Sequence, residues 1–477
     1  MDRVKYLLKN MGFLALSSLS IKIISFLLVP VYTSVLSTEE YGTYDWFNTT
    51  VSLLIPFLTL NIKESTLRFS LSKNYDKKKI FSISLKYSLY SIVYFSMFIF
   101  FNHYCVISVA VDDFKELIIL MFLAQSLQGL LTNFARGMDR LKDIAISGVI
   151  CSLMIIILNI ILLVPLHMGL VGYFIANIVG PLVQVIYLFI VCKCWKYISF
   201  PNCEKKLETE MRKYSLPLIA NSTAWWVNSV SDRYIIIWLR GVAENGVYAV
   251  AGKIPSIVDA FQGIFSQAWT LSAVKEFDPE DSNGFFSKMY DMYNMCMTFA
   301  SGIIIIVSRL LAKFLYSKDF FSAWQYVPFL TLAVLFGALA GYCGAIFSAV
   351  KASRYYAYST LTGAVTNFLL NIVMVKPLGA LGAAIATALS YFVIFEIRFI
   401  NAKKFIKIRI NIKRDYLAYL LLFFLSVLFF IFKEECWQLY LIDAIIFAGL
   451  VALYGNQICA IKEKLIDIIN TKGADLK

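Results

Sequence analysis

Apolar residues in this chain come in runs of about 20, and charged residues, Gly or Pro separate one run from the next. A run of this length can cross the hydrocarbon core of a bilayer as one α-helix. The pattern therefore predicts an all-α, polytopic membrane protein. We expect about fourteen transmembrane segments, at 11–36, 42–61, 81–101, 115–135, 143–166, 170–192, 214–239, 246–271, 286–308, 326–350, 355–376, 379–401, 415–432 and 437–459.

Composition and charge agree with this pattern. Of 477 residues, 59% are hydrophobic and only 16% are charged, against about 45–50% and 25% in soluble domains, so a soluble protein is excluded. The net charge of +13 comes from short Lys and Arg clusters between the apolar runs, where membrane proteins carry them. We therefore expect no nucleic acid among the partners. The nine Cys residues have no CxxC or CxxH spacing, and they predict neither a zinc site nor a disulfide framework.

The distribution of positive charge predicts the orientation. Most of the 44 Lys and Arg residues fall at the termini and in the alternate loops on the same side, which indicates cytoplasmic termini. The first segment is too long for the core of a signal peptide, so we interpret it as a retained helix. No outer loop exceeds roughly twenty residues, which leaves no room there for a folded domain. The function is therefore expected to reside within the bilayer.

Two short motifs occur twice. The residues EYGTY at 40–44 correspond to ENGVY at 244–248, and GLVGYFIA at 169–176 corresponds to GALGAAIA at 379–386. The two separations are nearly equal, and each motif holds an equivalent place in a group of six helices. This indicates an internal duplication, although Gly-x-x-Gly is also common in membrane helices for packing reasons.

The duplication predicts two six-helix lobes related by a pseudo-twofold axis along the membrane normal, with a binding site between them. Two further helices follow at the C-terminus. We expect an N-lobe at 1–192, a cytoplasmic linker at 193–213, a C-lobe at 214–402, and the last two helices with a tail at 403–477.

Charged and polar residues inside the segments are the candidate site, because a charge at the bilayer centre costs about 3 kcal/mol or more. Lys22 lies near the middle of the first segment, about 16 Å from its start. Interfacial snorkelling is the alternative for this residue. Other candidates follow helical spacing on the second, seventh and eighth segments: Asp45, Asn48, Glu64, Arg68, Asn228, Asp232, Asp259 and Gln262. Arg233 adjoins Asp232 on the chain, and Lys253 lies two turns into the eighth segment, about 120° around the helix from Asp259.

For several of these residues a structural role is the alternative. Asp232 and Arg233 could form an internal charge pair, and Arg68 could be an anchor beside a basic loop. His103 and His167 lie near outer helix ends without a cluster of metal ligands, so no metal site is expected. No GxxxxGK loop or nucleophile elbow is present, which disfavours ATP-driven transport by this chain alone and serine hydrolysis.

One stretch resembles a known family. Residues 26–33 (FLLVPVYT) followed by 36–45 (LSTEEYGTYD) resemble the first helix pair of Wzx-type bacterial polysaccharide repeat-unit flippases, in the multidrug/oligosaccharidyl-lipid/polysaccharide exporter superfamily. The regions around Arg68, Asp232–Tyr234, Lys253 and Asn371 are also similar to that family. The resemblance spans at least the first twelve predicted helices and implies a fold of the MATE/MurJ type.

The resemblance implies a function. The chain would move an undecaprenyl-diphosphate-linked oligosaccharide from the cytoplasmic to the outer leaflet of the bacterial inner membrane by alternating access. Lys22, Arg68, Arg233 and Lys253, with Asn48, Asn228 and Gln262, would bind this substrate. Asp45, Glu64, Asp232 and Asp259 would be counter-ions or a site for a coupling H⁺ or Na⁺. Membrane lipids, a polysaccharide polymerase and other assembly proteins are the implied partners, and no cofactor is expected.

Two other functions stay open at this point. A multidrug exporter of the same superfamily would favour an acidic, aromatic cavity, whereas this chain offers four basic candidates. An integral-membrane glycan polymerase or acyltransferase would be expected to use a long outer loop or a His-centred site, and the sequence shows neither. We therefore expect a transporter and no enzyme.

Overall fold

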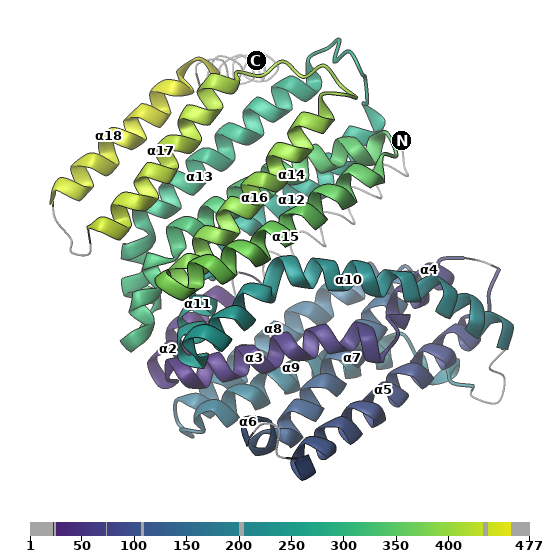
Figure 1. The fold of residues 1–477 in the computed structure, drawn as a ribbon. Coiled ribbons are helices and arrows are strands. Elements are labelled where there is room, and N and C mark those ends of the chain that lie inside the picture. The colour runs from purple at the N-terminus through teal and green to yellow at the C-terminus, as the bar shows by residue number, and fades with distance from the viewer. Residues whose placement is uncertain are drawn as a thin grey trace, which may run out of the picture. The chain divides into compact units, whose positions relative to one another are not determined.

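The protein is helical throughout the part that the structure describes. The computed structural model describes residue 22 and residues 25–72, 74–105, 109–199, 205–432 and 437–458, and it gives the backbone alone for 102–105, 109, 225, 228, 439 and 440. These residues contain helices and no strand (Figure 1). Nine of the described helices are long and apolar enough to cross a membrane. The predicted all-α, multi-pass membrane fold is confirmed.

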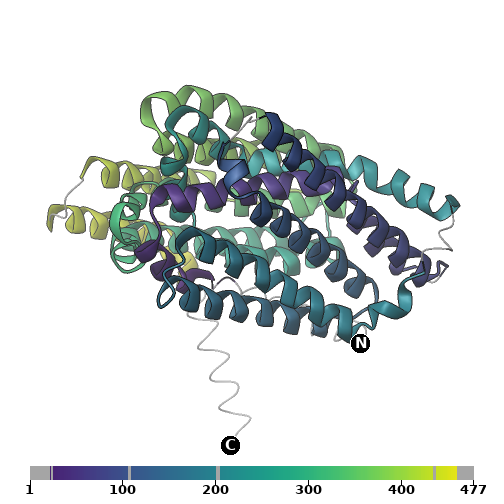
Figure 2. The same cartoon turned by 90° about the horizontal axis from the view of Figure 1, so that it is seen from below.

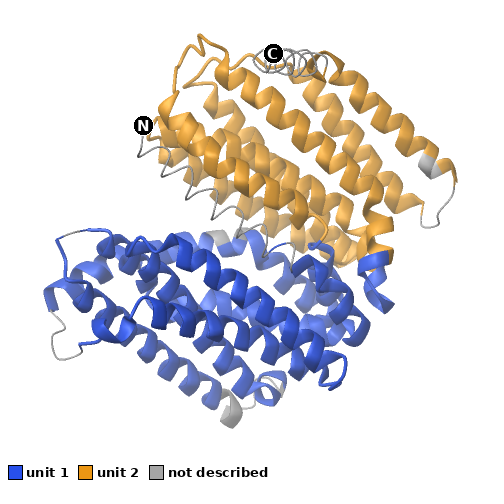
Figure 3. Cartoon of the chain, turned by 180° about the vertical axis from the view of Figure 1, so that it is seen from behind, with its two compact units in different colours: residues 1–253, 314–321 blue, residues 254–313, 322–477 orange. Residues whose placement is uncertain are grey.

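The chain forms two compact units (Figure 3). The first comprises Met1–Lys253 and Phe314–Phe321, and the second comprises Ile254–Lys313 and Ser322–Lys477. These bounds follow contacts within the chain, whereas the predicted lobes follow the repeat. Residues 205–253 join the first unit because their helices pack against the second predicted segment.

The helices of the first unit include four that match predicted spans closely, at 81–101, 115–135, 143–166 and 170–192. Their bounds, with those of the other helices, are α2 (Val29–Val35), α3 (Thr38–Leu58), α4 (Ile62–Ser70), α5 (Lys77–Cys105), α6 (Val109–Asp113), α7 (Lys115–Gly137), α8 (Leu141–Leu163), α9 (Gly169–Val191), the 3₁₀ helix η1 (Cys194–Tyr197), α10 (Lys205–Arg240) and α11 (Val242–Ala251). In Figures 1 and 2, α7, α8 and α9 run alongside one another.

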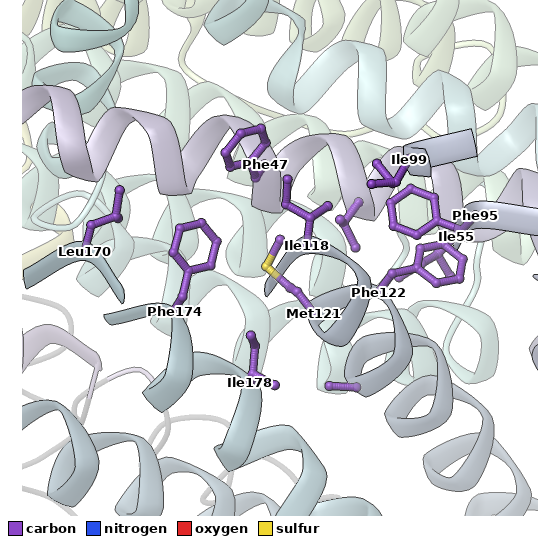
Figure 4. Close-up of a cluster of buried hydrophobic side chains, with 12 residues drawn as sticks. Phe47, Ile55, Phe95, Ile99, Ile118, Met121, Phe122, Leu170, Phe174 and Ile178 are labelled. Carbon is purple, nitrogen blue, oxygen red and sulfur yellow. The ribbon is translucent and has the colours of Figure 1, made fainter. Parts of the chain in front are cut away.

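A cluster of buried apolar side chains joins α3, α5, α7 and α9 (Figure 4). Phe95 of α5 stacks on Phe122 of α7 with ring centroids 4.4 Å apart, and Phe47 of α3 lies 6.2 Å from Phe174 of α9. Each buried aromatic ring contributes a large apolar area and a preferred ring geometry. The cluster therefore holds one face of α3, and the polar face of α3 is left for other partners.

One predicted segment is interrupted. The predicted span 246–271 is broken between α11 and α12 (Ser256–Lys275), with Pro255 as the N-cap of α12. A continuous helix was wrong there, because Pro cannot donate the backbone hydrogen bond of a helix interior. The predicted span 42–61 ends near its predicted boundary, since α3 ends at Leu58 and Leu60 and Asn61 have φ values of 52° and 50° before α4 begins.

The first repeated motif has a reciprocal contact at its centre. A Cβ added to Gly42 of α3 would lie 2.1 Å from the carbonyl oxygen of Val242, and one added to Gly246 of α11 would lie 2.0 Å from that of Thr38. Thr38 precedes Gly42 by the same four residues by which Val242 precedes Gly246. Equivalent residues thus meet each other across a local two-fold axis, as the duplication predicts.

The second repeated motif has a shared backbone conformation. Gly169 and Gly379 occupy the same position in the two copies and have φ values of 51° and 61°, in the left-handed region. Glycine reaches this region without a steric cost. Gly172 and Gly382 then pack closely on the preceding helix in each copy. The repeated glycines therefore adopt a positive φ at the start of α9 and of α16, and they allow close helix packing in both copies.

The second unit is built around α14, most of which is buried between α12 and α16. α13, α17 and α18 lie side by side at the C-terminal end (Figure 1). The helices of this unit are α12, α13 (Phe285–Leu315), the 3₁₀ helix η3 (Lys318–Gln325), α14 (Val327–Ala349), α15 (Ser353–Leu378), α16 (Ala380–Ala402), α17 (Ile412–Ile431) and α18 (Trp437–Leu453).

The glycine contact between α3 and α11 predicts an asymmetric effect of alanine. Gly246→Ala should destabilise the protein by about 1–3 kcal/mol, because the new methyl group overlaps a backbone atom that cannot rotate away. Gly263→Ala in α12 is the matched control, since nothing lies within 4 Å of its Cβ position, and it should be neutral or slightly stabilising. Thermal unfolding of the two purified variants in detergent measures both effects. Equal melting temperatures would contradict the close contact.

Candidate functional site

The predicted polar residues of the second and seventh segments meet in a buried charge cluster within the first unit. α3 begins at a capping box in which Ser37 and Glu40 bond each other's backbone, and this fixes the helix start two turns before Asp45. Asp45 is only 6% exposed. A carboxylate in that position requires partners from the protein, and α10 and α11 supply them.

Asp45 is held by two side chains from far along the sequence. Nη1 of Arg233 forms an ion pair with Oδ1 of Asp45. Nδ2 of Asn245, a fully buried residue of α11, donates to the other carboxylate oxygen at 3.2 Å. The same amide lies 3.4 Å from the carbonyl oxygen of Gly42. Both oxygens of Asp45 are therefore used, and the three helices are joined at one carboxylate.

Asp232 forms the second acidic position of the cluster. Its carboxylate accepts the phenol proton of Tyr248 and the backbone N–H of Arg233, the latter at 2.9 Å. Asp232 is 6% exposed. It therefore joins α10 to α11, and it also interacts electrostatically with the Arg233 guanidinium. The ion pair of Arg233 is made with Asp45, so the internal charge pair of Asp232 with Arg233 stays a prediction.

Lys253 completes the charge balance. It lies in the break between α11 and α12 and is half-buried, and its ammonium group interacts electrostatically with Asp45 and Arg233. Two carboxylates thus face two cations. The cluster carries no formal excess of positive charge, in contrast to the strongly cationic site that the sequence predicted.

Arg233 still has binding capacity. Its side chain is 26% exposed, whereas that of Asp45 is 9% exposed. A guanidinium group has five N–H donors, and among the described residues only one of these is bonded, to Asp45. The ion pair therefore orients the guanidinium and leaves its other donors available. Such a planar, oriented donor set suits the oxygens of a phosphate.

The polar faces of α3, α4 and α10 also bond directly to one another. Nε1 of Trp226 donates to the carbonyl oxygen of Thr49 at 3.1 Å, and Oγ of Ser65 donates to that of Met211 at 2.6 Å. Nδ2 of Asn61 donates to Ser222 at 3.2 Å. These three hydrogen bonds join α10 to α3 and to the start of α4.

The remaining predicted substrate-binding residues lie on several helices, and the side chain of one lies outside the description. Nε2 of Gln125 on α7 donates to Asn48 at 2.9 Å. Arg68 is exposed at the end of α4. Lys22 is helical and half-buried. The side chain of Asn228 lies outside the described residues. Gln262 belongs to α12 of the second unit.

The other predicted ion-coupling residues are also dispersed. Glu64 lies in α4, one turn before Arg68, and the described residues show no ion pair between them. Asp259 lies in the first turn of α12 and is half-buried. Asp45 and Asp232 are the only two of the four predicted carboxylates that the described contacts place in the charge cluster.

Sequence reasoning missed several bonded residues. Asn245 and Tyr248 belong to the repeated motif at 244–248, which indicated an internal duplication. Their side-chain N–H and O–H groups were a signal that they could donate to a buried carboxylate. In the second unit, Arg414 bonds Asp291 and Asp415, each at 2.7 Å. Arg398 of α16 is buried over the ring of Tyr356 at 3.9 Å. A charge inside an apolar run was the available signal for Arg398, whereas Arg414 lies just before the predicted span 415–432. Within the residues that the structure describes, no group of three or more His, Cys, Asp or Glu could hold a metal ion.

Comparison with known families now adds to the geometry. A family model described as polysaccharide biosynthesis protein matches residues 7–271, more than half of the chain. The chain belongs to this polysaccharide biosynthesis family. The resemblance to polysaccharide flippases that the first helix pair shows is thereby confirmed. Comparison with curated proteins finds no match.

Solved structures share the fold across most of this family member. The lipid II flippase MurJ, in an inward closed conformation, is similar with a TM-score of 0.69 and 13% identity, over 94% of this chain and 100% of that one. An inward-facing multidrug resistance MATE transporter of the MOP superfamily has a TM-score of 0.65 and 14% identity, over 82% and 97%. A MOP superfamily transporter from Pyrococcus furiosus has 0.54 and 13%, over 83% and 95%. At 13–14% identity, these similarities show that this chain shares the fold of those proteins.

The Asp45–Arg233 pair predicts energetic coupling between α3 and α10. Asp45→Asn and Arg233→Gln should each destabilise the protein, and the double variant should lose less than the sum by about 1–3 kcal/mol, because the second change removes the group that the first leaves unpaired. A double-mutant cycle from thermal unfolding in detergent gives this coupling energy. Additive losses would show that the two groups do not interact in the folded protein.

Proposed function

We propose that this protein is a flippase that moves a polyprenyl-diphosphate-linked oligosaccharide repeat unit from the cytoplasmic to the outer leaflet of a bacterial inner membrane. The observation that carries the proposal is the combination of a polysaccharide biosynthesis family match with a fold shared with a lipid II flippase over 94% of the chain. The resemblance of the first helix pair to repeat-unit flippases implies a sugar carried on a lipid diphosphate. The same headgroup chemistry is therefore the natural candidate here.

The physical task explains why charged residues lie within the membrane. An unpaired diphosphate in hydrocarbon faces a barrier above about 10 kcal/mol. Oriented cationic donors replace part of its lost hydration. Arg233 is such a donor, since Asp45 holds it and leaves the rest of its guanidinium group unbonded among the described residues. We propose Arg233 as the first contact for the diphosphate, supported by Lys253 beside it.

The direction of transport needs no energy source within this chain. With a cytoplasm-negative potential, outward movement of each negative charge is favoured by about 2.3 kcal/mol per 100 mV. The lipid tail can stay in the bilayer while the headgroup crosses. Alternating exposure of the site to the two sides is the cycle that we propose, with both termini in the cytoplasm.

Loss of the Arg233 guanidinium should stop transport without preventing membrane insertion. Arg233→Ala is expected to accumulate lipid-linked oligosaccharide in the inner leaflet and to deplete surface glycan by at least about tenfold, which corresponds to 1.4 kcal/mol of lost transition-state binding. Lys22→Ala should act in the same direction. Leaflet accessibility of the labelled glycolipid, measured in sealed membrane vesicles, provides the assay.

Arg136→Ala is the matched control, because Arg136 is an exposed arginine at the end of α7. It should transport like the unmodified protein. Normal surface glycan in both Arg233→Ala and Lys22→Ala, at equal protein levels, would refute the proposal. A deletion strain that becomes drug-sensitive and retains its glycan would instead favour a multidrug exporter.

A further inference from the structure

The strongest unassigned feature of the molecule is a buried carboxyl group in the last described helix. Asp443 of α18 is 2% exposed. Neither of its carboxylate oxygens has a hydrogen-bond partner among the described residues. This distinguishes it from Asp45, Asp232 and Asp415, whose carboxylates each accept at least one hydrogen bond. A buried carboxylate without a partner is strongly disfavoured, so the group must be neutral or must receive a ligand.

Asp443 points towards α13. Phe447, Leu450 and Tyr454 follow it on α18 at the spacing of one helical face. Phe447 and Leu450 contact the Cα region of Gly302 on α13, at 3.7 and 3.5 Å from its Cβ position. Tyr454 receives a hydrogen bond from Nδ2 of Asn294 at 3.2 Å. Helices α18 and α13 are therefore antiparallel, and helical register puts Asp443 on the shared face, beyond Gly302.

The facing surface of α13 is a polar stripe. Four of its residues are fully buried and recur at helical spacing: Asn294, Thr298, Ser301 and Ser308. The hydroxyl of Ser301 also has no described hydrogen-bond partner. By register, Asp443 lies near the stretch between Ser301 and Ser308. Packing between two apolar helices does not require these polar side chains. Their amide and hydroxyl groups form a row of hydrogen-bond donors and acceptors next to the carboxyl group of Asp443.

A hydrogen-bonded network leads to one end of this stripe. Arg414 bonds Asp291 and Asp415 at 2.7 Å. Tyr454 lies 3.5 Å from Asp415, and Tyr419 donates to Asn294 at 2.9 Å. The network begins at the first turn of α17 and reaches inward along α13. Asp443 lies about 16 Å from Tyr454 along the helix axis, towards the start of α18. The polar stripe of α13 runs between the two positions.

The charged and titratable groups on the packed helices are few. On α13, Arg309 follows Ser308 and is half-buried, with its guanidinium 4.6 Å from the ring centre of Trp324. On α17, Arg414 and Asp415 lie at the opposite end and bond each other. On α18, Tyr454 is the described titratable neighbour. None of these groups makes a described bond with Asp443.

We propose that Asp443 is a proton-binding site, which is protonated in the described conformation and exchanges its proton through the polar stripe of α13. The proton adds to one carboxylate oxygen and leaves to water or to a hydroxyl of the stripe, so no other reactant is needed. Resting on the proposed flippase function, this site would make transport responsive to a proton gradient. It would place the coupling ion in the C-terminal helices instead of at Asp45, Glu64, Asp232 or Asp259.

Infrared spectroscopy of the purified full-length protein in lipid vesicles tests the proton site without any substrate. A carbonyl band of a protonated carboxyl group is expected at neutral pH and should disappear in Asp443→Asn, which is isosteric with the neutral acid. Asp443→Glu should keep a band at a shifted position. Asp113→Asn, an exposed aspartate, is the matched control and should leave the spectrum unchanged. A band that persists in Asp443→Asn would overturn the proposal.

Transport in the same vesicles tests the coupling. The rate of glycolipid translocation should rise with a proton gradient of about one pH unit in the unmodified protein and in Asp113→Asn, and Asp443→Asn should lose this response. An unchanged response in Asp443→Asn, or a rate that follows sodium instead, would overturn it. If the unmodified protein moves no glycolipid, the proposed function fails, while the infrared result still decides whether Asp443 holds a proton.

Discussion

The structure depends on one constraint: polar groups removed from water need partners inside the protein. In the first unit this requirement is met by pairing groups from distant helices, as Asp45 is paired with Arg233 and Asn245. In the second unit Arg414 meets the same requirement with Asp291 and Asp415. Helices α3 and α10 are not among the nine described helices that are long and apolar enough to cross a membrane, and they carry Asp45 and Arg233. The polarity of these two helices is tolerated because the Arg233 guanidinium of α10 pairs with the Asp45 carboxylate of α3.

The balance of the charge cluster changes how an anion would be received. Two carboxylates and two cations do not supply the excess positive charge that a diphosphate requires. They instead hold one guanidinium in a fixed orientation, with most of its donors unbonded among the described residues. Preorganised donors lose little entropy when a ligand arrives. The cluster would therefore help to bind an anion by orienting the Arg233 donors. Neutralisation of the diphosphate charge would have to come from other residues.

The sequence predicted the fold class and several spans well, because hydropathy over about 20 residues is a strong signal. It could not locate the break before Pro255, since a short irregular stretch barely changes an average over an apolar run. It identified Asp45 and Asp232 as candidates through their helical spacing, and Arg233 and Lys253 as charges inside apolar segments. Spacing within one helix carries no information about pairing between helices, so the partner of Arg233 was not foreseen. Asp443 was overlooked because one acid in an apolar run leaves the hydropathy almost unchanged.

The reciprocal glycine contact has a consequence for how such a molecule could arise. Thr38 and Gly42 meet Val242 and Gly246 in the way that one surface meets its own copy in an isologous dimer. A shorter chain carrying a single copy of this motif would therefore have had a self-complementary surface before any fusion. In the joined chain the two copies are free to diverge, and they have done so: Tyr41 packs among aromatic rings, whereas its counterpart Asn245 holds the buried acid.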